Sequence, residues 1–248
     1  MVYQKNLSYQ CVLGFAFFVE FLTFSLAAPS LRAQSLKVSI TFPPVENRGT
    51  LSRTAGGGMR GGDCLTGKTP LTALTPTNNI GTTVSGNPTF FWYIPQSEAK
   101  SAEFVVTDNQ YQEIYATTLA LNGTPGVASL SLPATVSLQT GKDYYWYVLL
   151  ICDPKNREQD MFVEGVVKRT ELSVEQKTKL ATATEPLKQA EMYAQARIWQ
   201  ETLAILAQLR HDRPHDSKVI DAWKELLNSV ELEAIATEPL VECCKAEK

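Results

Sequence analysis

Histidine is nearly absent from this 248-residue sequence, which contains two, His211 and His215. A serine or cysteine hydrolase needs an imidazole base beside its nucleophile, so residues 1–210 cannot carry that chemistry. The spacing of the two histidines suits zinc on a helix, but Pro214 lies between them and indicates a turn. A zinc site would also need the adjacent cysteines near the C-terminus, and we expect neither a metal nor another cofactor.

An excess of positive charge is also missing, because 23 lysines and arginines stand against 26 aspartates and glutamates, for a formal net charge of -3. General nucleic-acid binding requires a basic surface, so we expect no nucleic-acid partner. Basic residues do gather in residues 34–68. This segment includes the six glycines of residues 49–62, which indicate a flexible, solvated tether. The alternative for its basic residues is contact with an acidic surface.

Long hydrophobic runs are scarce, and the longest lies near the N-terminus, from Val12 to Ala28. Lys5 precedes this run and small residues follow it, which is the pattern of an export signal. We predict a signal peptide over residues 1–33, cleaved after Ala33, and a periplasmic or extracellular mature protein. An uncleaved membrane anchor is the alternative, since the run is barely long enough to span a bilayer.

Residues 64–170 are predicted to form a β-sandwich. Short runs rich in β-branched and aromatic residues alternate there with proline, Asp-Asn and Asn-Gly turns. An edge strand is predicted at 35–40, inside the linker that we assign to residues 34–63. The strands expected within the sandwich cover residues 70–76, 89–94, 102–107, 111–119, 127–132, 144–153 and 161–169.

A tyrosine corner is predicted at the entrance of the central strand. Leu138, Gly141 and Tyr144 have the required spacing, in which the tyrosine hydroxyl bonds back to the preceding turn. A strand containing Trp92 comes before the corner, and Trp146 comes just after it. We therefore predict a mainly β protein with an α part: an immunoglobulin- or fibronectin-like β-sandwich whose two tryptophans face the interior from opposing sheets.

From residue 171 the hydrophobic period changes from two to 3.6, which predicts a small helical region over residues 171–236. Ser173 and Gln176 form a predicted capping box for the first helix. Pro186 sits where a second helix would begin, because proline suits the first helical position. A tail follows over residues 237–248.

Spacings within the helical region resemble a single tetratricopeptide repeat, followed by a helix that Asp216 or Ser217 is expected to cap. One repeat cannot form a superhelical groove, so we predict a helical hairpin that packs on the sandwich or stacks with a partner. Trp199 and Trp223 are the candidate anchors for such a partner, because tryptophan is enriched among the residues that dominate binding.

Residues Gly62 to Thr69 match the P-loop pattern letter for letter. A P-loop needs a buried strand before its glycines and a helix that begins at its lysine. Here a glycine-rich segment precedes the match and Pro70 follows it. We therefore expect no nucleotide ligand.

Four cysteines remain after removal of the signal, and export favours disulfides. We predict that Cys64 pairs with Cys152, which would tie the end of the linker to the end of the central strand. Cys243 and Cys244 are adjacent and can pair with each other only under strain. Intermolecular linkage and free thiols both stay open for these two.

Several sequence blocks are informative through their order along the chain. They are the Gly/Arg-rich stretch running into Cys64, LTAL at 71–74, NPTFFWYIP at 87–95, TPGVASLSLP at 124–133, KDYYWYVLLICD at 142–153 and MYAQARIWQETLAILAQLR at 192–210. Together they resemble a family of secreted cyanobacterial proteins known as domain of unknown function 928 (DUF928). The resemblance implies an exported protein of two parts, and it implies no activity.

We predict a non-catalytic binding or structural module of the cell envelope. One alternative is an adaptor subunit whose helices dock on a membrane-bound partner, which predicts an exposed apolar stripe on those helices. The other is a carboxylate-dependent enzyme using Asp153, Asp160 or Glu164, which predicts a pocket with convergent acids of raised pKa. Because Lys155 and Arg157 are interleaved with these acids, an ion-paired loop is the expected arrangement.

Overall fold

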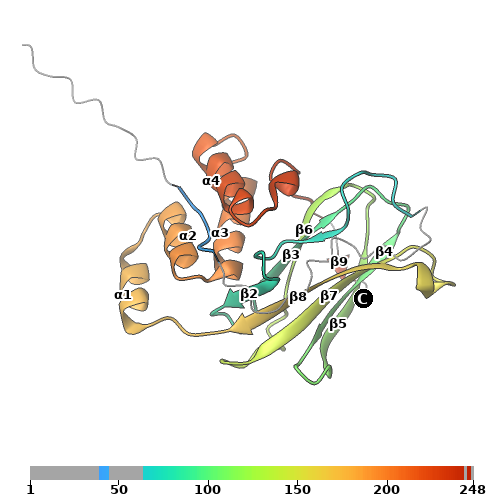
Figure 1. The fold of residues 1–248 in the computed structure, drawn as a ribbon, viewed down its shortest axis with the longest axis horizontal. Helices are drawn as coiled ribbons and strands as arrows, with labels where there is room; N and C mark the ends of the chain where they lie inside the picture. Colours follow the sequence, from blue (N-terminus) through green and yellow to red (C-terminus); the bar gives the residue numbers. More distant parts are fainter. Residues whose placement is uncertain (1–38, 45–63, 243–244, 247–248) are drawn as a thin grey trace, which may run out of the picture. The chain divides into compact units, whose positions relative to one another are not determined.

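Two β-sheets lie face to face, and helices cover the outer side of the smaller one (Figure 1). The computed structural model describes residues 39–44, 64–242 and 245–246; the predicted signal peptide, most of the predicted linker and the adjacent cysteines lie outside them. The strand order is β1-β3-β6 in the smaller sheet and β2-β8-β7-β4-β5-β9 in the larger. The strands are β1 (Thr72–Ala73), β2 (Ile80–Thr83), β3 (Thr89–Ile94), β4 (Ser101–Thr107), β5 (Glu113–Ala120), β6 (Gly126–Ser131), β7 (Asp143–Ile151), β8 (Met161–Arg169) and β9 (Lys245–Ala246).

Trp92 and Trp146 face the space between the sheets, as predicted. Trp92 comes from β3 of the smaller sheet and Trp146 from β7 of the larger, and both are buried. Phe104 of β4 contacts both: its ring is stacked on Trp92 with centroids 5.8 Å apart and lies 6.3 Å from that of Trp146. Because aromatic side chains bury large apolar areas, this cluster forms the centre of the sandwich core.

The predicted tyrosine corner is present at the entrance of β7. The Gln139 amide donates a hydrogen bond of 2.8 Å to the Tyr144 hydroxyl, and Leu138 is buried beside them. Gly141 has a φ of 81°, in the left-handed region that glycine adopts without steric cost. The corner therefore ties the central strand to the turn before it.

Strand β2 is a feature that the sequence does not predict. It pairs in parallel with β8, from Ile80 opposite Val166 to Thr83 opposite Arg169. Its sequence, Ile-Gly-Thr-Thr, is too short and too poor in apolar residues to show alternation. Conversely, residues 39 and 40 of the predicted edge strand are not in a strand. The two facing sheets with a shared core confirm the predicted β-sandwich, while its immunoglobulin-like topology stays a prediction.

Helices follow the sandwich, as predicted. The capping box is present, since the Gln176 amide donates to the Ser173 hydroxyl and the Ser173 amide donates to the Gln176 side chain. Pro186 is the first residue of its helix, and the Asp216 side chain caps the last one by accepting from the Lys218 amide. None of the described helices is long and apolar enough to cross a bilayer. They are α1 (Val174–Thr182), α2 (Pro186–Gln195), α3 (Trp199–Asp212) and α4 (Ser217–Asn228), with 3-10 turns η1 (Arg157–Gln159) and η2 (Glu233–Ile235).

Strand β3 is buried on both faces because it lies between the sandwich core and the helices. Phe90, Trp92 and Ile94 belong to the sandwich core. Phe91 and Tyr93 alternate with them and belong to a second core, formed with α2, α3 and α4. A strand with two buried faces has a continuous apolar sequence, which explains the run TFFWYI. The protein therefore has three layers: the larger sheet, the smaller sheet and the helices.

Residues 39–44 pack against the helices, although the sequence predicts a linker there. Ile40 and Phe42 are buried in the helical core, and the Phe42 ring meets the Trp199 ring edge-on at 5.1 Å. The Phe42 amide donates to the hydroxyl of Ser229, just after α4, at 2.9 Å. This part of the linker prediction is wrong, because the helical layer buries the two apolar side chains.

The C-terminal segment pairs with both sheets. The Val127 amide of β6 donates to the Pro239 carbonyl and the Val241 amide donates to the Val127 carbonyl, at 2.7 and 2.9 Å. Further on, β9 pairs with the end of β5 in the larger sheet. Arg210 of α3 holds the same segment through a hydrogen bond of 2.8 Å to the Glu238 carbonyl. The predicted tail therefore runs from the edge of one sheet to the edge of the other.

Replacing Gly165 by alanine is expected to lower the free energy of unfolding by about 1 to 3 kcal/mol. A Cβ atom at Gly165 would lie 2.5 Å from Nε1 of Trp146, its register partner on β7, and this tryptophan is packed in the core. Urea unfolding followed by tryptophan fluorescence measures the change. Gly81→Ala is the matched control, because a Cβ there meets nothing closer than 3.4 Å. Equal losses in the two variants would contradict the steric explanation.

Candidate functional site

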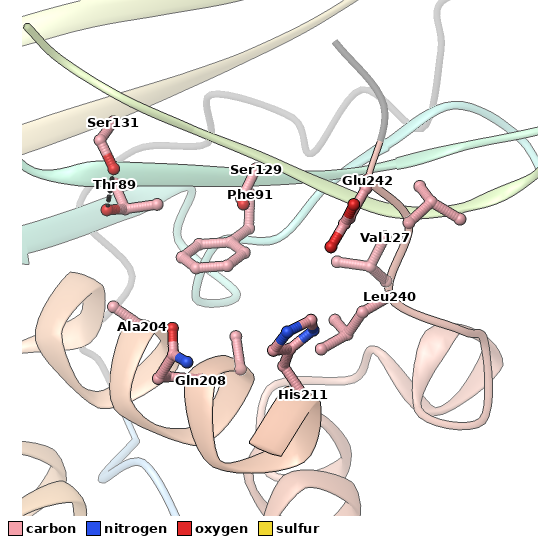
Figure 2. A pocket seen from close by; sticks show the side chains of 12 residues that line it. Thr89, Phe91, Val127, Ser129, Ser131, Ala204, Gln208, His211, Leu240 and Glu242 are labelled. Carbon is pink, nitrogen blue, oxygen red and sulfur yellow. Dashed lines mark hydrogen bonds between the residues drawn. The ribbon is translucent and has the colours of Figure 1, made fainter. Parts of the chain in front are cut away.

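A groove of about 410 Å³ lies between the outer face of the smaller sheet and α3 (Figure 2). Strands β3 and β6 form its floor, α3 forms one wall, and the C-terminal segment forms the other. The lining residues are Thr89, Phe91, Val127, Ser129, Ser131, Ala204, Ala207, Gln208, His211, Leu240, Val241 and Glu242.

Small side chains create this groove. On α3, Ala204 and Ala207 stand where larger residues would reach the sheet. On β6, Ser129 and Ser131 alternate with residues directed at the sandwich core. Larger side chains at these four positions would fill the space between sheet and helix. The groove is therefore a direct result of alanine on the helix and serine on the strand.

Polar side chains surround an apolar floor in the groove. The Thr89 and Ser131 hydroxyls share a hydrogen bond of 2.7 Å between β3 and β6. His211 from α3 and Glu242 from the C-terminal segment point into the groove from its two walls (Figure 2). The ring of Phe91 covers the floor between them. A ligand would thus meet hydrogen-bonding groups at the rim and an apolar surface below.

Strand β6 has an open edge within the groove. Its antiparallel ladder with β3 uses the backbone groups of alternate residues, so those of Val127, Ser129 and Ser131 point away from β3. The C-terminal segment pairs with Val127. No other described residue pairs with Ser129 or Ser131 on this side. An extended chain can pair with such an edge through main-chain hydrogen bonds.

Trp199 and Trp223, the predicted anchors for a partner, are both 0% exposed, so that prediction is wrong. The Trp199 indole donates to the Leu74 carbonyl at 2.9 Å, and the Trp199 amide donates to the Thr82 hydroxyl at 3.2 Å. Trp223 lies in the helical core beneath the guanidinium of Arg210, 5.2 Å from the ring centroid. The two tryptophans hold the helical layer together and do not reach the surface.

A carboxylate fixes α3 against the sandwich. One oxygen of Glu201 accepts hydrogen bonds from the Thr83 hydroxyl at 2.7 Å and from the Val84 and Ser85 amides at 3.0 Å each. Glu201 lies in the first turn of α3, where the helix dipole also favours a negative charge. This contact sets the position of the wall of the groove relative to β2.

Cys64 and Cys152 form the predicted disulfide. It joins the first residue of the sandwich to the residue just after β7, with a sequence separation of 88. The Glu98 amide also donates to the Cys64 carbonyl at 2.9 Å, which holds this part of the chain beside the loop before β4. The start of the sandwich is thus attached covalently to the central strand.

Two backbone amides of the P-loop-like segment are engaged in hydrogen bonds within the protein. In its described part, the Thr66 and Gly67 amides both donate to the Gln96 carbonyl, at 2.9 and 3.3 Å. The segment continues into strand β1 and not into a helix. A phosphate-binding loop needs free amides at the start of a helix, whereas in the described part of this segment these two amides are engaged and no helix follows.

The acids of the alternative enzyme site are engaged in local contacts. Arg157 pairs with both carboxylate oxygens of Glu103, at 3.1 and 2.9 Å, and with Asp160. These contacts, with Glu103 first, raise the pKa of the Arg157 guanidinium above its ordinary value. Asp153 accepts a hydrogen bond within its own turn, and Glu164 lies on the outer face of β8. The structure therefore confirms the expected ion-paired loop.

The two histidines lie in different elements. His211 is in the last turn of α3, where it lines the groove, and His215 is in the turn that follows. This agrees with the turn that Pro214 indicates. Among the described residues, no group of three or more histidine, cysteine, aspartate or glutamate side chains could hold a metal ion.

The groove itself is a site that sequence reasoning missed. Its residues come from β3, β6, α3 and the C-terminal segment, which are far apart along the chain. The signal in the sequence was weak: two alanines among the leucines of α3, and serines alternating in β6. Only the packing of the helical layer on the smaller sheet shows that these small residues face one another.

The fold and the groove define a three-layer domain, a β-sandwich whose smaller sheet is covered by helices. The chain belongs to the DUF928 family, because the family model Domain of Unknown Function (DUF928) matches residues 55–240. This match confirms the resemblance of the sequence blocks. No match was found among the curated proteins or among the solved structures.

Proposed function

We propose that this protein is an exported, non-catalytic binding module of the cell envelope that holds an extended segment of a partner protein in the groove between β6 and α3. The observation that carries the proposal is the open edge of β6, where the backbone groups of Ser129 and Ser131 have no partner among the described residues. An extended peptide adds to such an edge as a further strand, and the main-chain hydrogen bonds provide its affinity.

The C-terminal segment supports this mode of binding. Leu240 already pairs in parallel with Val127, so this edge of β6 accepts a strand in the molecule itself. An added peptide would extend that pairing along the rest of β6. Alternate side chains of a strand point to the same side, so every second peptide residue would enter the groove. Phe91, His211 and Glu242 would then select among peptide sequences.

Two further features support export. The signal sequence predicted over residues 1–33 would deliver the chain to the envelope, where disulfides form and persist. The Cys64–Cys152 disulfide fits that compartment. The immunoglobulin- or fibronectin-like topology belongs to the same proposal, supported by the tyrosine corner at Tyr144.

Replacing Ser129 by proline is expected to weaken peptide binding at β6 about tenfold. Proline removes the amide that points away from β3, and edge strands tolerate proline where the amide faces outward. The loss of a main-chain hydrogen bond accounts for the expected size. The probe is a soluble peptide of alternating threonine and valine, and the measurement is the saturable shift of the Ser131 amide signal in NMR spectra, since the proline variant keeps that amide.

Ser129→Val is the matched control, because it changes the side chain and keeps the amide. It should bind the peptide as well as the unchanged protein does. If no described amide of β6 shifts with the peptide, or if the proline and valine variants lose binding equally, strand addition at this edge is wrong.

The adaptor and the carboxylate enzyme stay predictions. Among the described residues, the exposed large hydrophobic side chains are Tyr111 and Val174, and only Val174 lies on a helix. The described helices therefore present no apolar stripe for a membrane-bound partner. The pairing of Arg157 with Asp160 likewise gives the enzyme alternative no support. Strand addition is favoured over both because the open edge and the groove coincide.

A further inference from the structure

Three tyrosines lie on the outer face of the larger sheet, which the described helices leave uncovered (Figure 1). Alternate side chains of β7 are buried in the sandwich core, so Tyr145 and Tyr147 face outward together. Tyr111, from the loop between β4 and β5, stacks on Tyr145 with ring centroids 5.2 Å apart and 22° between the ring planes. We call Tyr111, Tyr145 and Tyr147 the tyrosine strip.

Tyr111 occupies a backbone position that usually belongs to glycine. Its φ is 61°, in the left-handed region that is strained for a bulky residue. The Gln110 and Gln112 amides donate to the Asp108 carboxylate at 2.8 and 2.9 Å, and the Tyr111 amide donates to the Asp108 carbonyl at 3.0 Å. The Tyr111 side chain is 66% exposed, so burial does not offset the strain. Strained residues of this kind concentrate at ligand-binding sites.

Carboxylates flank the tyrosine strip. Glu164 of β8 is in register with Tyr147, and Glu113 begins β5 just after the loop that carries Tyr111. Neither glutamate forms an ion pair with a described residue. The pKa of Tyr145 and that of Tyr147 are raised, first by burial and further by neighbours that include Glu164. The charge of Glu164 therefore acts on both rings, in addition to the larger effect of burial.

A hollow of about 500 Å³ adjoins the strip over β4 and β5. Val105 lines the hollow and is also the register partner of Tyr147, so the two features are continuous. Glu113 also lines the hollow, and Glu103 adds one further carboxylate there. Among the described residues, Arg157 pairs with Glu103 and Lys168 pairs with Asp143. Glu113 and Glu164 are left without an ion pair to a described residue, so they supply negative charge beside the strip and the hollow.

We propose that the tyrosine strip and the hollow bind lysine or arginine side chains from a basic segment of a partner protein. A cation over a tyrosine ring is attracted by the ring quadrupole, and the flanking glutamates supply charge complementarity. The site lies on the larger sheet, whereas the groove lies on the smaller one. It is thus a second site, and the proposal for it does not depend on whether the groove binds a peptide.

Calorimetric titration of the purified protein with a lysine octapeptide tests this proposal at low and high salt. Tyr147→Ala and Tyr111→Gly are each expected to weaken binding about two- to fivefold, the range of an exposed cation–π contact. Glycine is used at 111 because it keeps the left-handed backbone. Tyr147→Phe keeps the aromatic face and should keep the affinity. Binding of the unchanged protein should fall steeply with salt.

Glu164→Gln should weaken binding and reduce its dependence on salt. Glu171→Gln is the control, because Glu171 is exposed and lies beyond the end of β8, and this variant should bind as the unchanged protein does. A lysine-acetylated octapeptide should not bind. Absence of binding, or equal losses in the two glutamine variants with unaffected tyrosine variants, would overturn the proposal. So would tighter binding of cellohexaose that the tyrosine substitutions abolish, because the strip would then be a carbohydrate site.

Discussion

Replacing Cys64 and Cys152 together by serine is expected to lower the free energy of unfolding by about 4 to 5 kcal/mol. The disulfide closes a loop with a sequence separation of 88, and a crosslink over such a loop removes much conformational entropy from the unfolded chain. The expected loss is a large fraction of the stability of an ordinary domain. Urea unfolding without reductant, followed by tryptophan fluorescence, measures the difference between the variant and the unchanged protein.

A reductant provides the control for the disulfide. It should shift the unfolding midpoint of the unchanged protein down to that of the double serine variant and leave the variant unaffected. Cys243 and Cys244 are replaced by serine in all samples, so that the reductant acts on one bond. An unchanged midpoint after reduction would show that the crosslink contributes no stability.

Trp199→Ala is expected to lower the free energy of unfolding by about 3 to 5 kcal/mol, the range for removing a buried large aromatic side chain. Trp199 is 0% exposed and lies where three segments meet: its ring contacts Phe42, its indole donates to the Leu74 carbonyl, and its amide bonds to Thr82. The substitution leaves a cavity among them. The helical layer should therefore loosen from the smaller sheet before the sandwich unfolds.

Amide hydrogen exchange measures that loosening residue by residue. In Trp199→Ala, protection should fall most in α2, α3 and α4, while β4 and β7 keep theirs until global unfolding. Trp199→Phe is the control, because it keeps most of the ring and loses the bond to Leu74. Its expected cost is about 1 to 3 kcal/mol, that of a buried carbonyl left without its donor. Equal loss of protection in helices and sandwich would contradict a separable layer.

Features that depend on neighbouring residues could be predicted from the sequence. The tyrosine corner at Tyr144, the capping box at Ser173 and the proline at the start of α2 each follow from residues a few positions apart. The facing tryptophans, Trp92 and Trp146, followed from their order along the chain on either side of the tyrosine corner. The pattern of each element was thus enough to define a sandwich followed by helices.

Features that depend on the packing of distant segments could not be predicted. A tryptophan on an apolar helix stripe such as Trp199 suits a partner surface or a core equally well, and only the position of the smaller sheet decides between them. The burial of Phe42 could not be predicted either, because the helices that cover it lie much further along the sequence. The groove could not be predicted for the same reason, since Ser129 of β6 and Ala204 of α3 come to line one groove only when the helical layer packs on the smaller sheet.

Phe42 is synthesised long before the residues that bury it. Its hydrogen bond to Ser229 spans 187 residues, which a ribosome adds in roughly 10 to 40 s at the usual rate of translation. Over that interval Ile40 and Phe42 are an apolar pair without their native contacts, a suitable target for a chaperone. Because contacts of such long range also slow folding, we expect the layer of helices to assemble late, after α4 and Ser229 have left the ribosome.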